Sequence, residues 1–213
     1  MQYRNFGKTG IKVSALGFGT MRFPLLHDEV VDEERAIGMI RHAIDEGVNY
    51  IDTAYPYHQG ESERIVGKAL ADGYREKTYL ATKCPVWKLQ KAEDFETLLN
   101  EQLEKLNTDH IDFYLLHALS GERMEDKVKP FELIKRMEKA KAEGKIRYLG
   151  FSFHDSYDVF QDIIDYYDGW DFCQIQYNYV DTEHQAGTKG LKYAAERGLG
   201  VVIMEDRKST RLN

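Results

Sequence analysis

The chain has 213 residues, of which 42% are hydrophobic and 31% charged, a balance typical of one globular domain rather than a fibre or a disordered segment. Its net charge of −7 argues against a nucleic-acid surface, because phosphate binding needs clustered Lys and Arg. Two cysteines, Cys84 and Cys173, are too few for a disulfide framework or a metal cluster. No apolar run resembles a signal peptide or a membrane span. We therefore expect a cytoplasmic protein with no metal site and no nucleic-acid or membrane partner.

The predicted elements begin with a small hairpin. Segments 3–6 and 12–13 flank Gly7 and Gly10, and glycines at such spacing favour a turn between two short strands. We expect this hairpin to cover the bottom of the domain.

A strand–turn–helix–glycine unit then recurs along the chain. The predicted strands are apolar, bounded by residues that break regular structure, and follow one another about every 30 residues, the size of one βα unit. They cover residues 15–18, 50–52, 78–82, 111–116, 146–151, 172–176 and 200–204. Between them, apolar residues keep the helical period on three stripes: Ile37, Ile40 and Ile44 after an Asp32 cap; Phe95, Leu98, Leu99, Leu103 and Leu106; and Phe131, Ile134, Met137 and Ala140. Gly47, Gly144 and Gly198 follow helix ends, where a left-handed residue stops a helix.

Strands that alternate with helices predict a parallel sheet covered by helices. Seven such strands fit a (β/α)8 TIM barrel better than an open Rossmann sheet, although periodicity alone does not decide between the two. The segment Gly17-x-Gly19-x-x-Arg22 lacks the third glycine of a dinucleotide-binding loop, which argues against the Rossmann alternative.

Four polar residues follow successive strands, where a barrel enzyme carries its chemistry. They are Asp52, Tyr57, Lys83 and His117. A buried ammonium beside a phenol stabilises the phenolate, a carboxylate fixes that ammonium in place, and an imidazole can orient a substrate oxygen. Each residue alone also fits a structural role: Asp52 as a helix cap, Tyr57 as a loop aromatic, Lys83 at a strand end and His117 in the core. The occurrence of all four at successive strand ends favours proton-transfer chemistry.

The chain resembles aldo-keto reductases over residues 1–205. The resemblance rests on Gly17-Phe18-Gly19-Thr20-Met21-Arg22, Asp52-Thr53-Ala54-Tyr55-Pro56-Tyr57 with Gly60-Glu61-Ser62-Glu63, Thr82-Lys83, Asp112-Phe113-Tyr114-Leu115-Leu116-His117 and Gly150-Phe151-Ser152. It implies that Tyr57 is the general acid, that Lys83 makes it more acidic, that Asp52 pairs with Lys83 and that His117 orients the carbonyl. It also implies hydride transfer between a nicotinamide cofactor and a small carbonyl or alcohol substrate.

The same resemblance assigns the cofactor site. It implies that Gly19, Thr20, Met21, Asp52, Ser152, Gln174 and Met204 hold the cofactor, which is NADP with NAD as the alternative. Ser152 and Gln174 would hold the carboxamide. The chain departs from the family pattern at Met204, where many relatives stack a ring on the nicotinamide, and at Phe153, where relatives often carry Asn.

Residues 206–213 lack a helical or strand period and resemble a translated sequencing adapter. We interpret them as an artefactual tail and residues 1–205 as a barrel that is incomplete after its seventh strand. The chain is most similar to a subgroup that often continues into a ferredoxin-like segment, so iron–sulfur clusters are expected only in a missing C-terminal part, and this chain alone is expected to be weakly active or inactive. A cofactor-sensing regulatory subunit and an iron–sulfur-linked electron-transfer oxidoreductase are alternatives to the reductase. The substrate and the oligomeric state stay open.

Overall fold

The computed structural model describes residues 1–205 as an α/β fold built on a curled parallel sheet. Among these residues the sheet has seven strands in the order β11-β10-β9-β8-β7-β6-β3. The strands are β3 (Phe18–Gly19), β6 (Tyr50–Asp52), β7 (Tyr79–Cys84), β8 (Ile111–Leu119), β9 (Ile146–Phe153), β10 (Phe172–Gln176) and β11 (Gly200–Met204). The predicted parallel, barrel-type sheet is therefore confirmed. The predicted tail, residues 206–213, lies outside the described residues.

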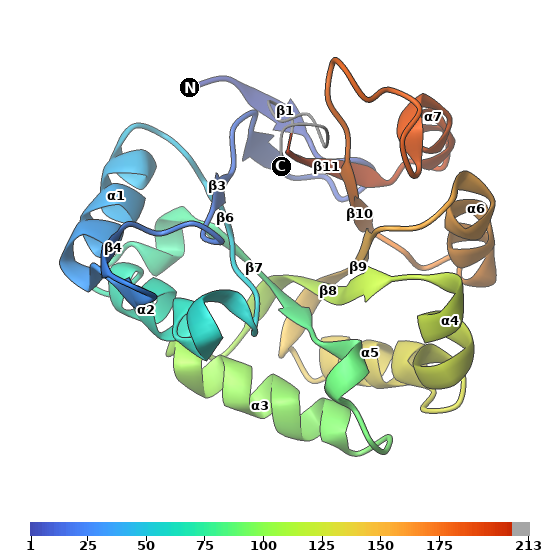
Figure 1. Cartoon of the computed structure of the whole chain (residues 1–213), viewed down its shortest axis with the longest axis horizontal. Coiled ribbons are helices and arrows are strands. Elements are labelled where there is room, and N and C mark those ends of the chain that lie inside the picture. Colours follow the sequence, from blue (N-terminus) through green and yellow to red (C-terminus); the bar gives the residue numbers. More distant parts are fainter. Residues whose placement is uncertain (206–213) are drawn as a thin grey trace.

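Helices cover the outer side of this sheet, as Figure 1 shows. They are α1 (Glu33–Asp45), α2 (Ser62–Ala69), α3 (Asp94–Leu106), α5 (Leu133–Ala142), α6 (Tyr157–Tyr166) and α7 (Gly187–Glu196), with the short segment α4 (Gly121–Arg123) after β8. Asp32 caps α1 as predicted, because its carboxylate accepts the Arg35 N–H at 3.1 Å. Gly47, Gly144 and Gly198 all have positive φ, which confirms the predicted helix ends.

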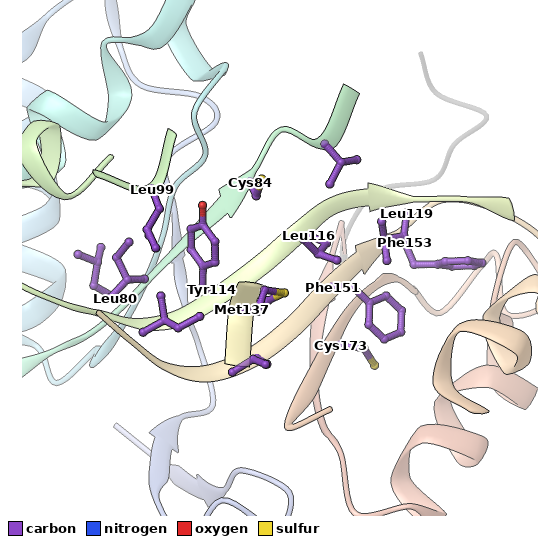
Figure 2. Close-up of a cluster of buried hydrophobic side chains, with 14 of the residues drawn as sticks. Leu80, Cys84, Leu99, Tyr114, Leu116, Leu119, Met137, Phe151, Phe153 and Cys173 are labelled. Atoms are coloured by element: carbon purple, nitrogen blue, oxygen red, sulfur yellow. The ribbon is translucent and has the colours of Figure 1, made fainter. Parts of the chain in front are cut away.

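Alternate residues of each strand face the two sides of the sheet. On β8, Tyr114 and Leu116 belong to the apolar layer between the sheet and its helices, where Figure 2 shows them near Leu99 of α3 and Met137 of α5. Phe113 of the same strand belongs to a second apolar cluster inside the curl. The molecule therefore has an outer core under the helices and an inner core within the sheet.

The predicted N-terminal hairpin is confirmed and covers the bottom of the inner core. β1 (Tyr3–Asn5) pairs antiparallel with β2 (Lys12–Ser14). Phe6, in the loop between them, packs against Phe113 and Phe172 at ring-centroid distances of 5.0 and 5.8 Å. A Cβ atom at Gly7 would lie 2.3 Å from the backbone nitrogen of Gly200, so only glycine allows this close approach of the hairpin to β11.

The structure differs from the sequence prediction in the segment before α1. The strand expected at 15–18 is only the two-residue β3, and a second hairpin follows it, formed by β4 (Leu25–His27) and β5 (Val30–Val31). Asp28 takes a positive φ of 44° in the turn, a conformation that Asp tolerates better than most residues. Asp28 and Glu29 therefore form the turn of a hairpin. Its strands are too short for an alternation of apolar and polar residues to be recognised in the sequence.

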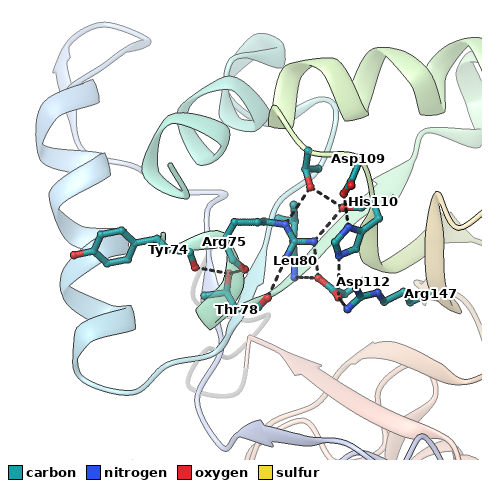
Figure 3. A network of polar contacts seen from close by, with 9 residues as sticks. Tyr74, Arg75, Thr78, Leu80, Asp109, His110, Asp112 and Arg147 are labelled. Atoms are coloured by element: carbon teal, nitrogen blue, oxygen red, sulfur yellow. Dashed lines mark hydrogen bonds and ion pairs between the residues drawn. The ribbon is translucent and has the colours of Figure 1, made fainter. Parts of the chain in front are cut away.

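A buried ion-pair network ties the strands together at the bottom of the sheet (Figure 3). Asp112, near the start of β8, is 1% exposed. Its carboxylate accepts hydrogen bonds from Arg75 and Arg147 at 2.8 and 2.9 Å and from the Leu80 N–H at 2.9 Å. The Asp112 carboxylate thus joins Leu80 of β7 and Arg147 of β9 to β8. The network therefore holds these three strands together at the end of the sheet opposite the polar strand ends.

We expect Asp112→Asn to lower the free energy of unfolding by about 3 kcal/mol, because two guanidinium groups lose the charge that compensates them. The measurement is urea denaturation. Asp168→Asn is the control, since Asp168 is exposed in the turn after α6, outside this network, and its loss should leave the unfolding midpoint unchanged. Equal effects of both substitutions would show that burial of Asp112 is not what gives the network its strength.

Candidate active site

The inward-facing residues change from apolar to polar toward the carboxyl ends of the strands. Tyr50 is followed two residues later by Asp52, Ala81 by Lys83, Leu115 by His117, Gly150 by Ser152, and Phe172 by Gln174 and Gln176. The first members of these series line the inner core, apart from Gly150, which lies beside Phe172. Because side chains two residues apart share a face of a strand, the polar members lie on the inner side of the sheet at its upper end. The site thus follows from strand period and the parallel direction of the strands.

Lys83 is the centre of the predicted catalytic group. Its side chain is 1% exposed, and its Nζ donates to Asp52 Oδ2 and to the Thr53 carbonyl, both at 2.7 Å. Burial alone would lower the pKa of Lys83, but the charge of Asp52 and the contact with Tyr57 outweigh it and raise the pKa. Lys83 is therefore a fixed cation. Asp52 forms an ion pair with it and does not act as the helix cap considered from the sequence.

Tyr57 lies against this lysine, and His117 lies against Tyr57. Lys83 Nζ is 5.1 Å from the Tyr57 ring centroid, and the Tyr57 and His117 rings meet edge to face at 6.2 Å. His117 also packs against Trp87 at 5.0 Å. The structure thus brings all four residues of the predicted set, Asp52, Tyr57, Lys83 and His117, into one group.

His117 is held neutral by its surroundings. Burial, then the charges of Lys83, His154 and Arg123, lowers the pKa of His117 to about 2. Its Nδ1 atom is buried without a hydrogen-bond partner among the described residues, so the satisfied core histidine considered from the sequence does not apply. A neutral imidazole can still donate or accept a hydrogen bond, and it keeps that ability over the whole physiological pH range.

This neutral imidazole makes the fold sensitive to acid. Between pH 6.5 and about 2, the unfolded chain binds a proton that folded His117 does not, so the free energy of unfolding falls as pH falls, by up to about 1.4 kcal/mol per pH unit. We expect His117→Gln to lose less stability than the wild type between pH 6.5 and 4.5, measured by thermal melting. His42→Gln, at an exposed position on α1, is the control. A slope unchanged by His117→Gln would contradict this account.

Two of the predicted cofactor residues present complementary hydrogen-bonding groups. Ser152 Oγ accepts the Ala118 N–H at 2.7 Å and keeps its own O–H free to donate. Gln174, paired with Ser152 in the β9–β10 register, places its Nε2 3.4 Å from Asp52 Oδ1, while its Oε1 is buried with no partner among the described residues. One donor and one orphaned acceptor side by side match the two ends of a carboxamide.

The remaining predicted cofactor residues differ in how far they are buried and in what they contact. Gly19 is opposite Asp52 in the β3–β6 register, and the Thr20 N–H donates to the Asp52 carbonyl at 2.9 Å. A Cβ atom at Gly19 would meet nothing within 4 Å, which leaves open space above this loop. Met21 is 57% exposed and adds no buried contact, whereas Met204 ends β11 half-buried beside Gln176.

Phe153 faces away from the site. Its ring is fully buried and packs on Phe160 of α6 at 5.1 Å, within the outer core (Figure 2). At this position, where relatives often carry Asn, the chain has an apolar ring that packs against α6.

Sequence reasoning missed the polar network that anchors Lys83 from behind. Glu63 of α2, fully buried, accepts hydrogen bonds from Thr82 at 2.7 Å and from Gln102 of α3 at 2.6 Å. Gln102 also donates to the Lys83 carbonyl at 3.1 Å. Burial, the largest influence, raises the pKa of Glu63. The signal was the Glu63 position in the Gly60-Glu61-Ser62-Glu63 motif, but its partner on α3 is 39 residues away.

His58, also missed, joins the loop that carries Tyr57 to the loop after β3. Its Nε2 accepts the Phe23 N–H at 3.1 Å and lies 3.1 Å from the Thr20 carbonyl oxygen, and its ring stacks on Phe23 at 5.1 Å. His58 has φ of 50° and the next residue, Gln59, 57°, so these contacts hold a left-handed turn directly after Tyr57.

Comparison with known proteins identifies the family of this chain. The model of the "Aldo/keto reductase family" matches residues 15–207. The chain belongs to this family, and the resemblance inferred from its motifs is confirmed. It is 36% identical over 162 residues to an aldo-keto reductase of Bacillus subtilis, covering 71% of this chain and 47% of that protein. It is 33% identical over 158 residues to an L-galactose dehydrogenase of Arabidopsis thaliana, covering 71% and 48%. The chain thus spans about half the length of these curated relatives.

Solved structures agree with the fold. An aldo-keto reductase of Klebsiella pneumoniae in complex with NADPH matches with a TM-score of 0.73 and 30% identity, covering 92% of this chain and 64% of that one. The holo form of an aldo-keto reductase of Bacillus halodurans matches with a TM-score of 0.78 and 29% identity, covering 95% of this chain and 65% of that one.

Within residues 1–205, every helix is too short or too polar to cross a lipid bilayer.

Proposed function

We propose that the protein is an NADP-dependent carbonyl reductase that also oxidises the corresponding alcohols. The observation that carries this proposal is the buried Lys83–Asp52 ion pair, 2.7 Å long, directly beside the Tyr57 ring at the carboxyl ends of the strands. The NADPH complex of the Klebsiella pneumoniae relative supports the choice of cofactor.

The residues present fit a nicotinamide cofactor. In the proposal the Ser152 hydroxyl and the Gln174 Oε1 atom hold the carboxamide, and Gly19, Thr20 and Met21 lie along the rest of the cofactor, with Asp52 and Met204 at its edges. When bound, the cofactor supplies the hydride that reduces a carbonyl carbon.

The protein supplies the proton and the placement. The Tyr57 O–H donates its proton to the carbonyl oxygen of the substrate, and the fixed charge of Lys83 stabilises the phenolate left behind. Neutral His117 donates a hydrogen bond that orients the same oxygen, while Asp52 holds Lys83 charged and in place. The Trp87 ring packs against His117 at 5.0 Å and supports the imidazole in this position.

The test is consumption of NADPH with 4-nitrobenzaldehyde, followed by absorbance, with NADH in parallel. We expect aldehyde-dependent oxidation of NADPH, at a low rate for this chain alone, and a still weaker response with NADH. Tight NADPH binding without turnover on any aldehyde would favour the second candidate, a cofactor-sensing regulatory subunit, which shares the cofactor site but needs no proton donor.

A further inference from the structure

A positive charge lies beside the candidate active site and has no role in the proposed chemistry. Arg123 ends α4, the short segment that follows β8, and its backbone N–H donates to Ser120 Oγ at 3.3 Å. Its guanidinium folds back and donates from Nη1 to the carbonyl of Ala118, the residue after His117. The guanidinium is therefore directed toward the strand end that carries His117.

Trp87 contacts both this cation and the imidazole. The Arg123 Cζ atom is 5.0 Å from the Trp87 ring centroid, and the Trp87 and His117 ring centroids are 5.0 Å apart. The guanidinium and the imidazole thus both contact one indole ring, so a substrate the size of a para-substituted benzaldehyde can reach both. Trp87 comes from the turn after β7 and Arg123 from the turn after β8, so two strand-end loops meet here.

The charge of Arg123 is not neutralised by the described part of the chain. Other arginines of this part, such as Arg75 and Arg136, contact carboxylates at 2.8 and 2.7 Å, whereas no carboxylate between residues 1 and 205 forms an ion pair with Arg123 in the structure. Its field reaches the site, because it contributes, after burial, Lys83 and His154, to the lowered pKa of His117. Apart from its bond to Ala118, the guanidinium keeps N–H groups that can bind a planar anion.

We propose that Arg123 and Trp87 form a subsite for the carboxylate of the substrate, so that the preferred substrates are aldehydes that carry a carboxylate about one aromatic ring away from the carbonyl. This inference rests on the proposed reductase function. Trp87 packs against the apolar body of the substrate, and Arg123 binds its anionic end, while the carbonyl oxygen lies at Tyr57 and His117. The two residues determine specificity and do not take part in proton transfer.

The test compares 4-carboxybenzaldehyde with 4-nitrobenzaldehyde, which have similar size and shape but differ in charge. We expect Arg123→Gln to lower kcat/KM for the carboxylate by about 10- to 100-fold, the range of a charge-assisted hydrogen bond, mainly through KM. The nitro compound should change less than about threefold. Arg123→Lys should keep most of the preference, because it keeps the charge. Lys91→Met, which removes an exposed cation after the same β7 turn, is the matched control and should change neither aldehyde.

A binding measurement separates this inference from the proposed reaction. Benzoate and benzamide have nearly the same shape, and we expect only benzoate to quench the tryptophan fluorescence of the protein in an Arg123-dependent way. Equal losses for both aldehydes in Arg123→Gln, or weaker NADPH binding, would overturn the subsite, since Arg123 would then support the loop or the cofactor. If the wild type reduces neither aldehyde but binds benzoate through Arg123, the reductase proposal fails and the anion subsite stands.

Discussion

Tyr57→Phe should reduce the rate of carbonyl reduction by about 10²- to 10⁴-fold, the range of general acid catalysis, while NADPH binds almost as tightly as before. The substitution removes one hydroxyl from a half-buried ring and keeps the contact of that ring with Lys83 and His117. The loss should therefore fall on kcat. Steady-state kinetics with 4-nitrobenzaldehyde and a fluorescence titration with NADPH measure the two quantities separately.

Tyr55→Phe is the matched control. Tyr55 precedes Tyr57 by two residues and its hydroxyl contacts Glu101 at 3.2 Å, on the helix side of the loop. Its loss should alter activity only slightly. An unchanged rate in Tyr57→Phe would show that another group donates the proton, and the assignment of the site would have to be revised.

Lys83→Met should lower reduction by about 10²- to 10³-fold, the usual effect of removing one group that stabilises developing charge. Without the ammonium, the phenolate left when Tyr57 gives up its proton is less stable, so the loss should fall mainly on kcat. The measurement is steady-state kinetics with 4-nitrobenzaldehyde. Methionine has nearly the length of lysine, so the packing around this buried position is kept.

Asp52→Asn separates catalysis from stability in the same pair. Lys83 stays beside Tyr57 in this variant but loses the carboxylate at 2.7 Å that favours its charged form, so the loss of activity should be smaller than in Lys83→Met, where the amine itself is gone. Lys83→Met leaves a buried carboxylate without its partner and should melt at a lower temperature than the wild type. The double variant should recover part of the melting temperature but none of the activity. Equal, pH-independent losses in both single variants would instead indicate a purely structural ion pair.

The sequence predicts best what depends on local period. Tyr50–Asp52, Phe172–Gln176 and Gly200–Met204 have the bounds expected for their strands, because short apolar runs between glycines and polar turns leave little choice of limits. The polar residues at strand ends were also predictable, since parallel strands place their carboxyl ends together. Asp52 and Lys83, 31 residues apart, could be paired on that ground.

What the sequence does not contain is the identity of long-range partners. Trp87 and Arg123 lie in turns whose sequences look like ordinary surface loops, and only folding brings them together beside His117. From the sequence, Glu63 looks like an ordinary exposed acidic residue of a helix. Its burial becomes evident only from its contact with Gln102, 39 residues away. Met21 stays a prediction from the motif, because burial does not fix the direction of its mostly exposed side chain. Such features depend on side-chain direction rather than on pattern.

The hairpin beneath the inner core has a consequence for how the chain reaches its fold. The Lys8 N–H donates to the Gly198 carbonyl at 2.7 Å, and Phe6 lies against Gly200 and Phe172. Lys8 thus finds its partner only after nearly two hundred more residues have been made. Contacts so distant in sequence carry a large loop-closure cost and slow folding. We therefore expect Phe6 to pack late in folding, after the sheet between the hairpin and the last described strand has curled.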